Sequence, residues 1–483
     1  MSLFDPQRWG LPNEAIDNLA GNFRNIWSRF KDCLKTKTHD TSEYGWVYLR
    51  GILTMDTGRN YANIARRVIG PDNDGQNLQH FMSDSPWDAG KVFSQIQQEI
   101  KERPELAGGM LTLDESGQER AGASSAGSSR QYLGRLGKVD MGQVGVGLGY
   151  YKDGLWTMVD AELYLTEKWF NDQHKPLWKG LHIPDKRTFA TKPQIGLQMI
   201  LQAQKNGLPF ETVSADSLYG RDGVFRASLD TAGIKYVVDI PKDYPVYTQK
   251  PITGVPETPA NKKGPPFSAI RVLNGVQPVQ VETLLSDVAL QKVQIRHTER
   301  GILVYDAAAK QIWTIDDQGT VRSEWLLFWR GPSDNTVSFS LSNAETSTPW
   351  QSLLRERALR YFAERVFQDA KSEAGWDELT ARKYRAWRHH SALDALALWF
   401  VALTKLDWAQ TFPRDENLVA ELEVVILPAL SMANIRELLK SVLPLQQLSQ
   451  EEARRLVIKH LVNRARSTRS RLKGQQQTRA PSP

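Results

Sequence analysis

The feature that most constrains the fold is a change in the spacing of apolar residues near position 108 of this 483-residue chain. Before that point, segments such as 23–30 and 46–53 carry apolar residues at the spacing of helices. After it, segments 110–114, 143–151 and 155–164 have the pattern of strands joined by short turns, which favours antiparallel pairing. A helical first part is therefore followed by a sheet.

The elements after the first strands follow an order that narrows the topology. A helix is predicted at 193–206, a strand at 211–216, a helix at 222–232 and a strand at 234–240. The resulting order β-β-β-α-β-α-β is the one that an RNase H-like sheet requires. Prolines then break any helix early in 245–345, and alternating runs follow them. The runs lie at 279–284, 292–297, 302–306, 311–315 and 325–329.

The predicted fold class is α/β, with an RNase H-like core that an all-β insertion interrupts, and with helical N-terminal and C-terminal regions. A helix resumes at about 349 and runs to 403, and another helical region covers about 416 to 466. The length predicts several domains. They are a helical DNA-binding domain at 1–105, the first part of the core at 106–244, the β-rich insertion at 245–345, the catalytic helix part at 346–410 and a helical region with a basic tail at 411–483.

The DNA-binding assignment of 1–105 depends on one segment. Residues 60–69 resemble the first helix of a helix-turn-helix, 70–75 the turn, and 78–81 the start of the second helix. A plain helical bundle explains the same pattern equally well.

Composition and charge limit the setting of the protein. No run of 18 apolar residues is present, so no membrane span is expected. The first residues lack the features of a signal peptide, and the single cysteine, Cys33, excludes an internal disulfide and a cysteine-built zinc site. We expect a protein of a reducing cytoplasm.

The end of the chain is strongly basic. From Arg454 onward there is no Asp or Glu, which favours a polyanionic partner, although a solubilising tail would have the same composition. The basic residues are Arg454, Arg455, Lys459, Arg464, Arg466, Arg469, Arg471, Lys473 and Arg479.

Three acidic residues lie at positions in the predicted strands and helix that would suit metal ligands. Asp114 and Asp216 each close an apolar strand, and Glu364 lies in the long helix. Carboxylates prefer hard cations such as Mg²⁺ or Mn²⁺, and a pair of such ions supports in-line displacement at a phosphodiester. An acid at a strand end is more often structural, so other acids compete with these three: Glu115, Asp160, Asp369 and Glu373.

The spacing around Glu364 singles it out from its neighbours. Arg360 lies four residues before Glu364, and Lys371 lies seven residues after it. At about 100° per residue of an α-helix, all three side chains would fall within a sector of roughly 40°. One face would carry a carboxylate between two cations, which suits a metal-bound anionic ligand. An exposed charged face with intrahelical pairs is the alternative.

These segments together resemble the DDE transposases of bacterial insertion sequences, the cut-and-paste group with a Y-x₂-R-x₃-E-x₆-K signature. Residues 111–117 are similar to the family's first-aspartate strand, 128–139 and 143–146 to the stretch after it, and 163–169 to the third strand and its exit. Residues 215–220 are similar to the second-aspartate motif. Arg360, Glu364 and Lys371 fit the signature, but Arg357 stands where its tyrosine is expected.

The resemblance implies roles for these residues. Asp114, Asp216 and Glu364 would be catalytic and hold two Mg²⁺ or Mn²⁺ ions, while Arg360 and Lys371 would bind DNA phosphates. Arg357 could take over a phosphate contact of the missing tyrosine, but not an aromatic one. The partner would be double-stranded DNA, both transposon ends and target, bound by a homodimer on paired ends. The resemblance also implies a bacterial cytoplasmic, nucleoid-associated protein.

The resemblance also implies a role for the insertion. In related enzymes the second strand is cut through a DNA hairpin, and an aromatic side chain of the insertion stacks on a flipped base. Trp313, Trp325 and Trp329 are the candidates, with core packing of the β region as the alternative.

Several functions remain open at this point. An active transposase is the leading hypothesis; a domesticated DNA-binding protein and an RNase H-like endonuclease without strand transfer are the alternatives. A carbohydrate hydrolase is remote because the basic tail has no role there. Residues 145–149 fit a glycine-bearing strand better than a nucleotide loop, and His389 and His390 are expected to be structural or to face DNA.

Overall fold

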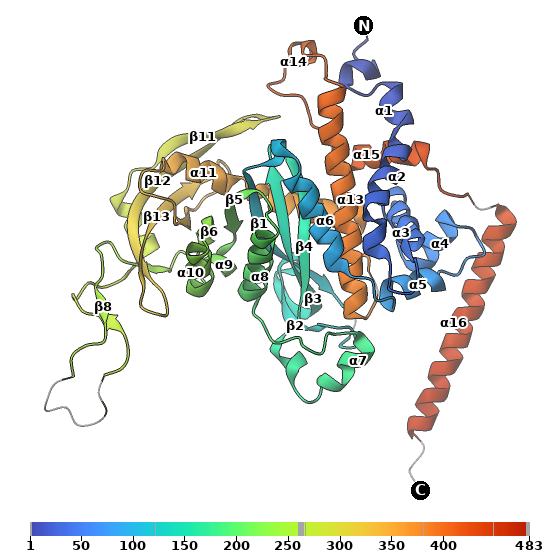
Figure 1. Ribbon diagram of the computed structural model, residues 1–483, viewed down its shortest axis with the longest axis horizontal. Coiled ribbons are helices and arrows are strands. Elements are labelled where there is room, and N and C mark those ends of the chain that lie inside the picture. Colours follow the sequence, from blue (N-terminus) through green and yellow to red (C-terminus); the bar gives the residue numbers. More distant parts are fainter. Residues whose placement is uncertain are drawn as a thin grey trace.

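The computed structural model in Figure 1 describes residues 2–120, 122–258, 265, 267–379, 381–447 and 449–479. Its centre is one large mixed sheet with helices packed against it. Among the described residues, no helix combines the length and apolar character that crossing a bilayer requires.

Short amphipathic helices form the first hundred residues, as their apolar spacing predicts. Side chains fix where two of them begin, because the Asn60 carboxamide accepts a hydrogen bond from the Asn63 amide and Asp88 accepts one from Gly90. The elements are η1 (Pro6–Trp9), α1 (Asn13–Asp17), α2 (Leu19–Phe30), η2 (Lys31–Leu34), α3 (Ser42–Thr54), α4 (Tyr61–Val68), α5 (Gln76–Ser83), α6 (Ala89–Lys101) and η3 (Pro104–Leu106).

The middle of the sheet carries both pairing directions. The strands are β1 (Gly109–Glu119), β2 (Ser129–Leu133), β3 (Lys138–Lys152), β4 (Leu155–Tyr164), β5 (Phe210–Ala215) and β6 (Lys235–Ile240). β3 pairs antiparallel with β1, β2 and β4, so the predicted antiparallel pairing of the first long strands is confirmed. β1 pairs parallel with β5, and β5 parallel with β6.

Strands from the proline-rich part of the chain extend this sheet. They are β11 (Gln291–Thr298), β12 (Gly301–Ile315), β13 (Val321–Arg330) and β14 (Ser338–Ser342). Because β14 pairs antiparallel with β6, the strand order is β11-β12-β13-β14-β6-β5-β1-β3, with β2 and β4 beside β3. Two small ladders lie outside it, formed by β7 (Pro245–Val246) with β10 (Val279–Gln280) and β8 (Thr253–Gly254) with β9 (Arg271–Val272).

Two predictions for this region were wrong in detail. The run at 279–284 is a strand for two residues only and then becomes the 3-10 helix η7 (Val281–Asp287). The runs at 302–306 and 311–315 belong to the single long strand β12, because the residues between them also pair with β13.

The remaining helices pack around the sheet. After β4 come η5 (Glu167–Phe170), η6 (Lys175–Leu177), α7 (Trp178–Leu181) and α8 (Lys192–Lys205), and after β5 come α9 (Ser217–Gly220) and α10 (Gly223–Thr231). The later ones are α11 (Trp350–Ala358), α12 (Tyr361–Asp369), the π-helical segment η8 (Ala370–Ala374), α13 (Tyr384–Thr411), α14 (Asn417–Glu421), α15 (Met432–Val442) and α16 (Gln450–Arg479).

Helix α13 links the sheet to the N-terminal helices. It contacts β4 on one side and α3 and α5 on the other, as Figure 1 shows, while α6 contacts both α13 and β4. One hydrophobic cluster of buried residues therefore runs from α2 through α13 to the strands. A second, smaller cluster joins Val237 of β6 to β11, β12, β13 and α11. The strands and helices that carry the predicted acids are all anchored in these two cores.

Candidate functional site

The two predicted aspartates lie at one edge of the sheet. In the parallel ladder between β1 and β5, Leu113 is opposite Ala215, so Asp114 and Asp216 follow directly at the same level. Asp216 begins α9, and its carboxylate accepts a hydrogen bond from the Leu218 amide at 2.9 Å. The carboxyl ends of neighbouring parallel strands are thus what bring these two acids together.

Glycines of β3 let the third acid approach them. A Cβ atom placed on Gly147 would lie 2.4 Å from the Phe367 ring, and one on Gly149 would lie 3.3 Å from Val366. Both partners belong to α12, so bare backbone on this face of β3 allows α12 to lie close against the sheet. The glycine-bearing segment 145–149 is confirmed as part of a strand, and its glycines position the helix that carries Glu364.

Arg360 is the residue around which the acids gather. Its Nη2 lies 3.8 Å from Oδ2 of Asp114, and its Nη1 lies 3.9 Å from Oε1 of Glu364. The same Nη1 lies 3.9 Å from Oδ2 of Asp239 in β6. The Arg360 side chain is 16% exposed, whereas that of Glu364 is 63% exposed and forms the outer side of the group.

Burial and the neighbouring arginines shift the pKa values of the acids in the site. Burial raises the pKa of Asp114 to about 6; Arg360 opposes the rise, and the nearby Asp216 adds to it. Burial also opposes ionisation of Asp239, but Arg357 and Arg360 outweigh it and hold the pKa of that carboxyl below its usual range. Burial raises the pKa of Tyr219 well above its ordinary value, and the neighbouring acids add to the rise.

The acids suit divalent cations by their chemistry, since Mg²⁺ and Mn²⁺ prefer carboxylate oxygens. Within the described ranges, however, no three Asp, Glu, His or Cys side chains are arranged closely enough to ligate one ion. The Arg360 guanidinium contacts Asp114 and Glu364 instead. In this structure the carboxylates of Asp114 and Glu364 are therefore grouped around the Arg360 guanidinium.

Each competing acid has a partner elsewhere. The Lys192 ammonium donates to Glu115 at 2.8 Å, and Arg388 pairs with Asp160 at 3.3 Å. The Trp156 indole donates to Asp369 at 2.9 Å, and Arg436 donates to Glu373 at 2.6 Å. These contacts give each competing acid a partner other than Arg360, around which Asp114 and Glu364 gather.

Asp239 belongs to the site but was not among the predicted residues. It is the second-last residue of β6, the parallel neighbour of β5, so it lies beside Asp216 in the sheet. A Cβ atom on Gly220 would meet the Asp239 carbonyl oxygen, which shows how closely the segment after Asp216 approaches β6. The sequence feature that could have identified Asp239 is its position near the end of β6, the third of the parallel strands.

Arg357 pairs with this missed acid. Its Nε and Nη2 donate to the two carboxylate oxygens of Asp239 at 3.0 and 2.7 Å. Its guanidinium carbon lies 3.5 Å from the centre of the Trp329 ring. Arg357 is therefore held inside the protein, at the position where the resemblance leads one to expect a tyrosine.

The three tryptophans of β12 and β13 differ in exposure. Trp329 is buried beneath Arg357, and its indole donates to the Ser340 hydroxyl at 2.9 Å. Trp325 is half-buried and donates to the Glu345 carbonyl, while Trp313 is half-buried and its backbone pairs with Tyr247.

The helix around Glu364 is interrupted on both sides. Arg360 is the residue before α12, and Lys371 lies in the π-helical segment η8. A π-helix does not keep the rotation of about 100° per residue of an α-helix. The common face of roughly 40° predicted for an unbroken helix therefore does not hold for Lys371.

The remaining predicted groups divide into buried and exposed ones. His389 and His390 are buried, and His389 contacts the Met82 and Trp87 carbonyls at 2.9 Å, so both histidines are structural. Arg464, Arg466 and Arg469 are exposed on α16, which Figure 1 shows extending away from the body of the protein.

Comparisons with known proteins place the chain in a family. The family model described as "DDE superfamily endonuclease" matches residues 29–302, more than half of the chain, including Asp114 and Asp216. A protein of Microchaete diplosiphon named "Probable transposase for insertion sequence element IS701" is 35% identical over 179 residues. That match covers 36% of this chain and 42% of the relative, so the chain spans less than half of the relative's length.

Proposed function

Because the chain belongs to the DDE superfamily of endonucleases, we propose that it is a transposase of an insertion element. It would bind the terminal inverted repeats, cut phosphodiesters there and join the 3′-ends to target DNA. The observation that carries the proposal is the convergence of Asp114, Asp216 and Glu364 around Arg360. The similarity to a named transposase supports DNA as the substrate.

The three acids would hold the metal ions of the reaction. DDE superfamily endonucleases generally use divalent metal ions, and we assign two Mg²⁺ or Mn²⁺ ions to Asp114, Asp216 and Glu364. Such a pair, when bound, activates the attacking oxygen and stabilises the leaving oxygen of an in-line displacement. The burial of Asp114 favours its protonated form, so this residue ionises most readily when a cation is near.

The basic residues around the acids would hold the phosphates. The Arg360 Nη atoms lie 3.8 and 3.9 Å from Asp114 and Glu364, which is longer than a hydrogen bond, so this partly exposed guanidinium keeps donors for a phosphate oxygen. Lys371 would make a second contact from η8. Arg357, which the sequence suggested for a third, would act indirectly by holding Asp239.

Double-stranded DNA would be bound over several parts of the chain. We assign it to α4 and α5 as a helix-turn-helix, with 1–105 as the DNA-binding domain, and to the exposed arginines of α16. The catalytic core would comprise 106–244 and 346–410, interrupted by the β-rich 245–345. Pairing of two ends by a homodimer follows from the same proposal, and the half-buried Trp313 and Trp325 are better candidates for stacking on a flipped base than the buried Trp329.

The test is strand cleavage on a DNA fragment that carries the inverted repeats flanking the gene, with Mg²⁺ present. We expect Asp216→Asn to abolish cleavage, because an amide is a poor ligand for a hard cation. Asp172→Asn, a substitution of an exposed aspartate far from the site in sequence, is the matched control and should leave cleavage unchanged. Cleavage by Asp216→Asn at the wild-type rate would contradict the assignment of the site.

A second assay separates transposition from its alternatives. Pre-cut ends supplied with target DNA should be joined if the protein is a transposase. Cleavage without joining would identify an endonuclease without strand transfer, and binding without cleavage a domesticated DNA-binding protein.

A further inference from the structure

A pocket of about 490 Å³ lies between the C-terminal half of α13 and the segment 412–432, and Asp369, the last residue of α12, is part of its lining. The turn between β3 and β4 and the residues after η1 close its other sides. Its walls are mainly apolar, and they include Leu155, Val401, Ala402, Trp408, Phe412 and Met432. The volume is in the range of pockets that hold small molecules.

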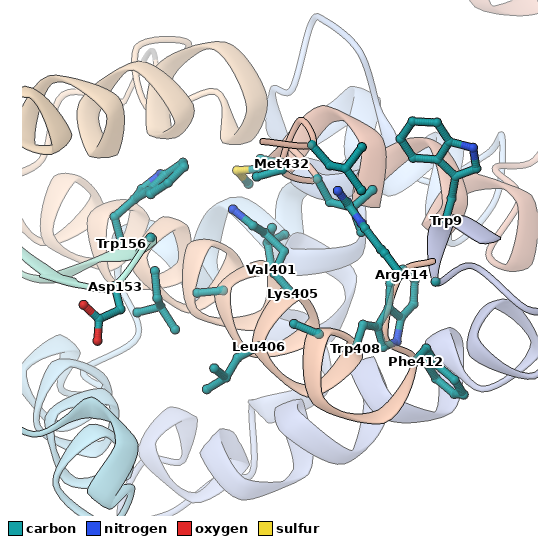
Figure 2. A pocket seen from close by; sticks show the side chains of 18 of the residues that line it. Trp9, Asp153, Trp156, Val401, Lys405, Leu406, Trp408, Phe412, Arg414 and Met432 are labelled. Atoms are coloured by element: carbon teal, nitrogen blue, oxygen red, sulfur yellow. The ribbon is translucent and has the colours of Figure 1, made fainter. Parts of the chain in front are cut away.

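One cation enters this apolar space. Figure 2 shows Lys405 of α13 in the pocket between Trp156 and Arg414. The Lys405 Nζ lies 4.2 Å from the centre of the Trp156 ring, and within the described part of the chain no carboxylate is within 4.0 Å of it. Burial lowers the pKa of Lys405 to about 8, and the more distant Asp369 offsets part of this. Lys405 is half-buried, and a partly desolvated ammonium that has an aromatic ring but no carboxylate beside it is stabilised when a ligand supplies the anion.

The other charged groups of the pocket do not fill this role. The Asp369 carboxylate accepts from the Trp156 indole at 2.9 Å and pairs with Arg365 at 3.7 Å. The Arg414 guanidinium donates to the Pro428 carbonyl and adds a second positive charge to the lining. The only other acid in the lining, Asp153, is exposed.

We propose that this pocket binds a monocarboxylate with an apolar chain or ring, whose carboxylate pairs with the Lys405 ammonium and whose apolar body packs among the side chains of α13 and the 412–432 segment. Charge and shape both select this class: the pocket offers a cation at its interior and apolar walls around it. A neutral apolar molecule would leave Lys405 unpaired, and a hydrophilic anion would leave the walls unfilled.

The pocket is connected to the catalytic helix. Trp156 donates to Asp369, the last residue of α12, and its ring stacks on Phe362 at 5.6 Å, two residues before Glu364. Filling the pocket against Trp156 should therefore hold α12 more firmly on the sheet. This coupling gives the pocket a regulatory role that rests on the proposed function, whereas binding itself does not.

Binding is tested by calorimetric titration of the full chain, without DNA, with decanoate below its micellar concentration. We expect saturable binding that Lys405→Met weakens by about tenfold or more, since the substitution keeps the volume and removes the charge. Lys186→Met, at an exposed lysine, is the matched control and should bind decanoate like the wild type. 1-Decanol should bind the wild type more weakly than decanoate, and Lys405→Met should not weaken its binding.

A second variant tests the walls independently of the charge. Ala402 is buried in the lining, and Ala402→Leu should weaken decanoate and decanol alike by reducing the free volume. Absence of saturable decanoate binding, or equal affinity in the wild type and Lys405→Met, would overturn the proposal.

Coupling to the catalytic helix is read from amide hydrogen exchange. Saturating decanoate should slow the exchange of residues 361–369, and this protection should be lost in Lys405→Met. Unchanged exchange there, with binding intact, would reject the coupling but not the site. Neither measurement uses DNA cleavage. Failure of the pocket proposal in these experiments is therefore distinct from failure of the proposed function in the Asp216→Asn cleavage assay.

Discussion

At the scale of single residues, the arrangement of the site depends on a chain of contacts behind the acids. The Trp329 indole donates to the Ser340 hydroxyl, and that hydroxyl donates to Asp239 at 2.7 Å. Arg357 donates twice to the same carboxylate, and Arg360 lies 3.9 Å from it. Asp239 thus fixes one arginine by hydrogen bonds and attracts the other toward the acids of the site.

Asp239→Asn should therefore destabilise the protein. Removing the buried carboxylate leaves Arg357 without its counter-charge, and we expect a loss of about 3–5 kcal/mol in the free energy of unfolding, measured by urea denaturation. Asp317→Asn, at an exposed position, should change it by less than about 0.5 kcal/mol.

The double variant Asp239→Asn, Arg357→Met adds a sharper criterion. Because it removes both charges, it should recover part of the lost stability. A double variant no more stable than Asp239→Asn alone would show that the pair is not what the single substitution disrupts.

Sequence reasoning reached some of these residues and missed others for a physical reason. Asp114 and Asp216 were predictable as neighbours because each ends an apolar run and the ends of parallel strands meet. Asp239 is embedded in such a run, and its partner Arg357 is 118 residues away, so their contact depends on how α11 packs on β6. No local pattern records that packing.

At the scale of elements, α13 combines two different environments. Its first half is buried against the sheet and the N-terminal helices, with His389 and His390 in the core. Its second half places Lys405 in the pocket, where burial lowers the pKa to about 8 from an ordinary value of 10.5. The helix therefore holds an ammonium in surroundings that favour the neutral amine.

This gives a pH dependence whose sign follows from the shift. Below about pH 8 the folded and unfolded chains both carry the proton, so the full cost of the buried charge is present. Between about pH 8 and 10.5 the folded chain loses the proton first, and the cost is relieved as pH rises. Lys405→Met should thus be more stable than the wild type by up to about 3 kcal/mol at pH 7.

The measurement is urea denaturation of both proteins from pH 7 to 10. The difference between Lys405→Met and the wild type should shrink as pH rises, while Lys186→Met should show no such trend. A difference that stays constant with pH would mean that the charge of Lys405 is not the cause.

Element boundaries also show where the sequence pattern was insufficient. The helix around Glu364 was predictable, but its division into α11, α12 and η8 was not, because the apolar spacing continues across both breaks. The two runs 302–306 and 311–315 suggested two strands because the three alanines and the lysine between them have weak strand propensity. Pairing with β13 overrides that preference.

At the scale of the whole molecule, one part stands apart from the two hydrophobic cores. Figure 1 shows α16 projecting away from the body, and Val457, Ile458 and Leu461 are exposed on it together with the arginines. Most other helices are tied to the sheet directly or through α13, and α14 is linked to η1 by the ion pair between Arg8 and Glu421. α16 is therefore placed to contribute to binding more than to stability.

Replacing Arg464, Arg466 and Arg469 by Gln should weaken binding to double-stranded DNA without changing the unfolding midpoint. The slope of log affinity against log salt should fall by about 0.9 for each phosphate contact that is lost. Fluorescence anisotropy at several salt concentrations measures both quantities.

The exposed apolar residues of α16 supply the matched control. Substituting Val457, Ile458 and Leu461 by Gln keeps the charge and should leave the salt slope unchanged. If the arginine variant bound DNA with the wild-type slope, α16 would have no part in phosphate recognition.

The ladder between β6 and β14 has a consequence for anyone who wishes to build chimaeras from this protein. Residues 245–345 cannot be exchanged as a surface loop, because β14 supplies the hydrogen-bond partners of one edge of β6. Excising the region would leave Lys235–Ile240 as an open edge beside β5, the strand that precedes Asp216, and open edges invite association with other chains. A replacement segment must bring its own closing strand in register with Val237 and Val238, or the shortened enzyme will aggregate.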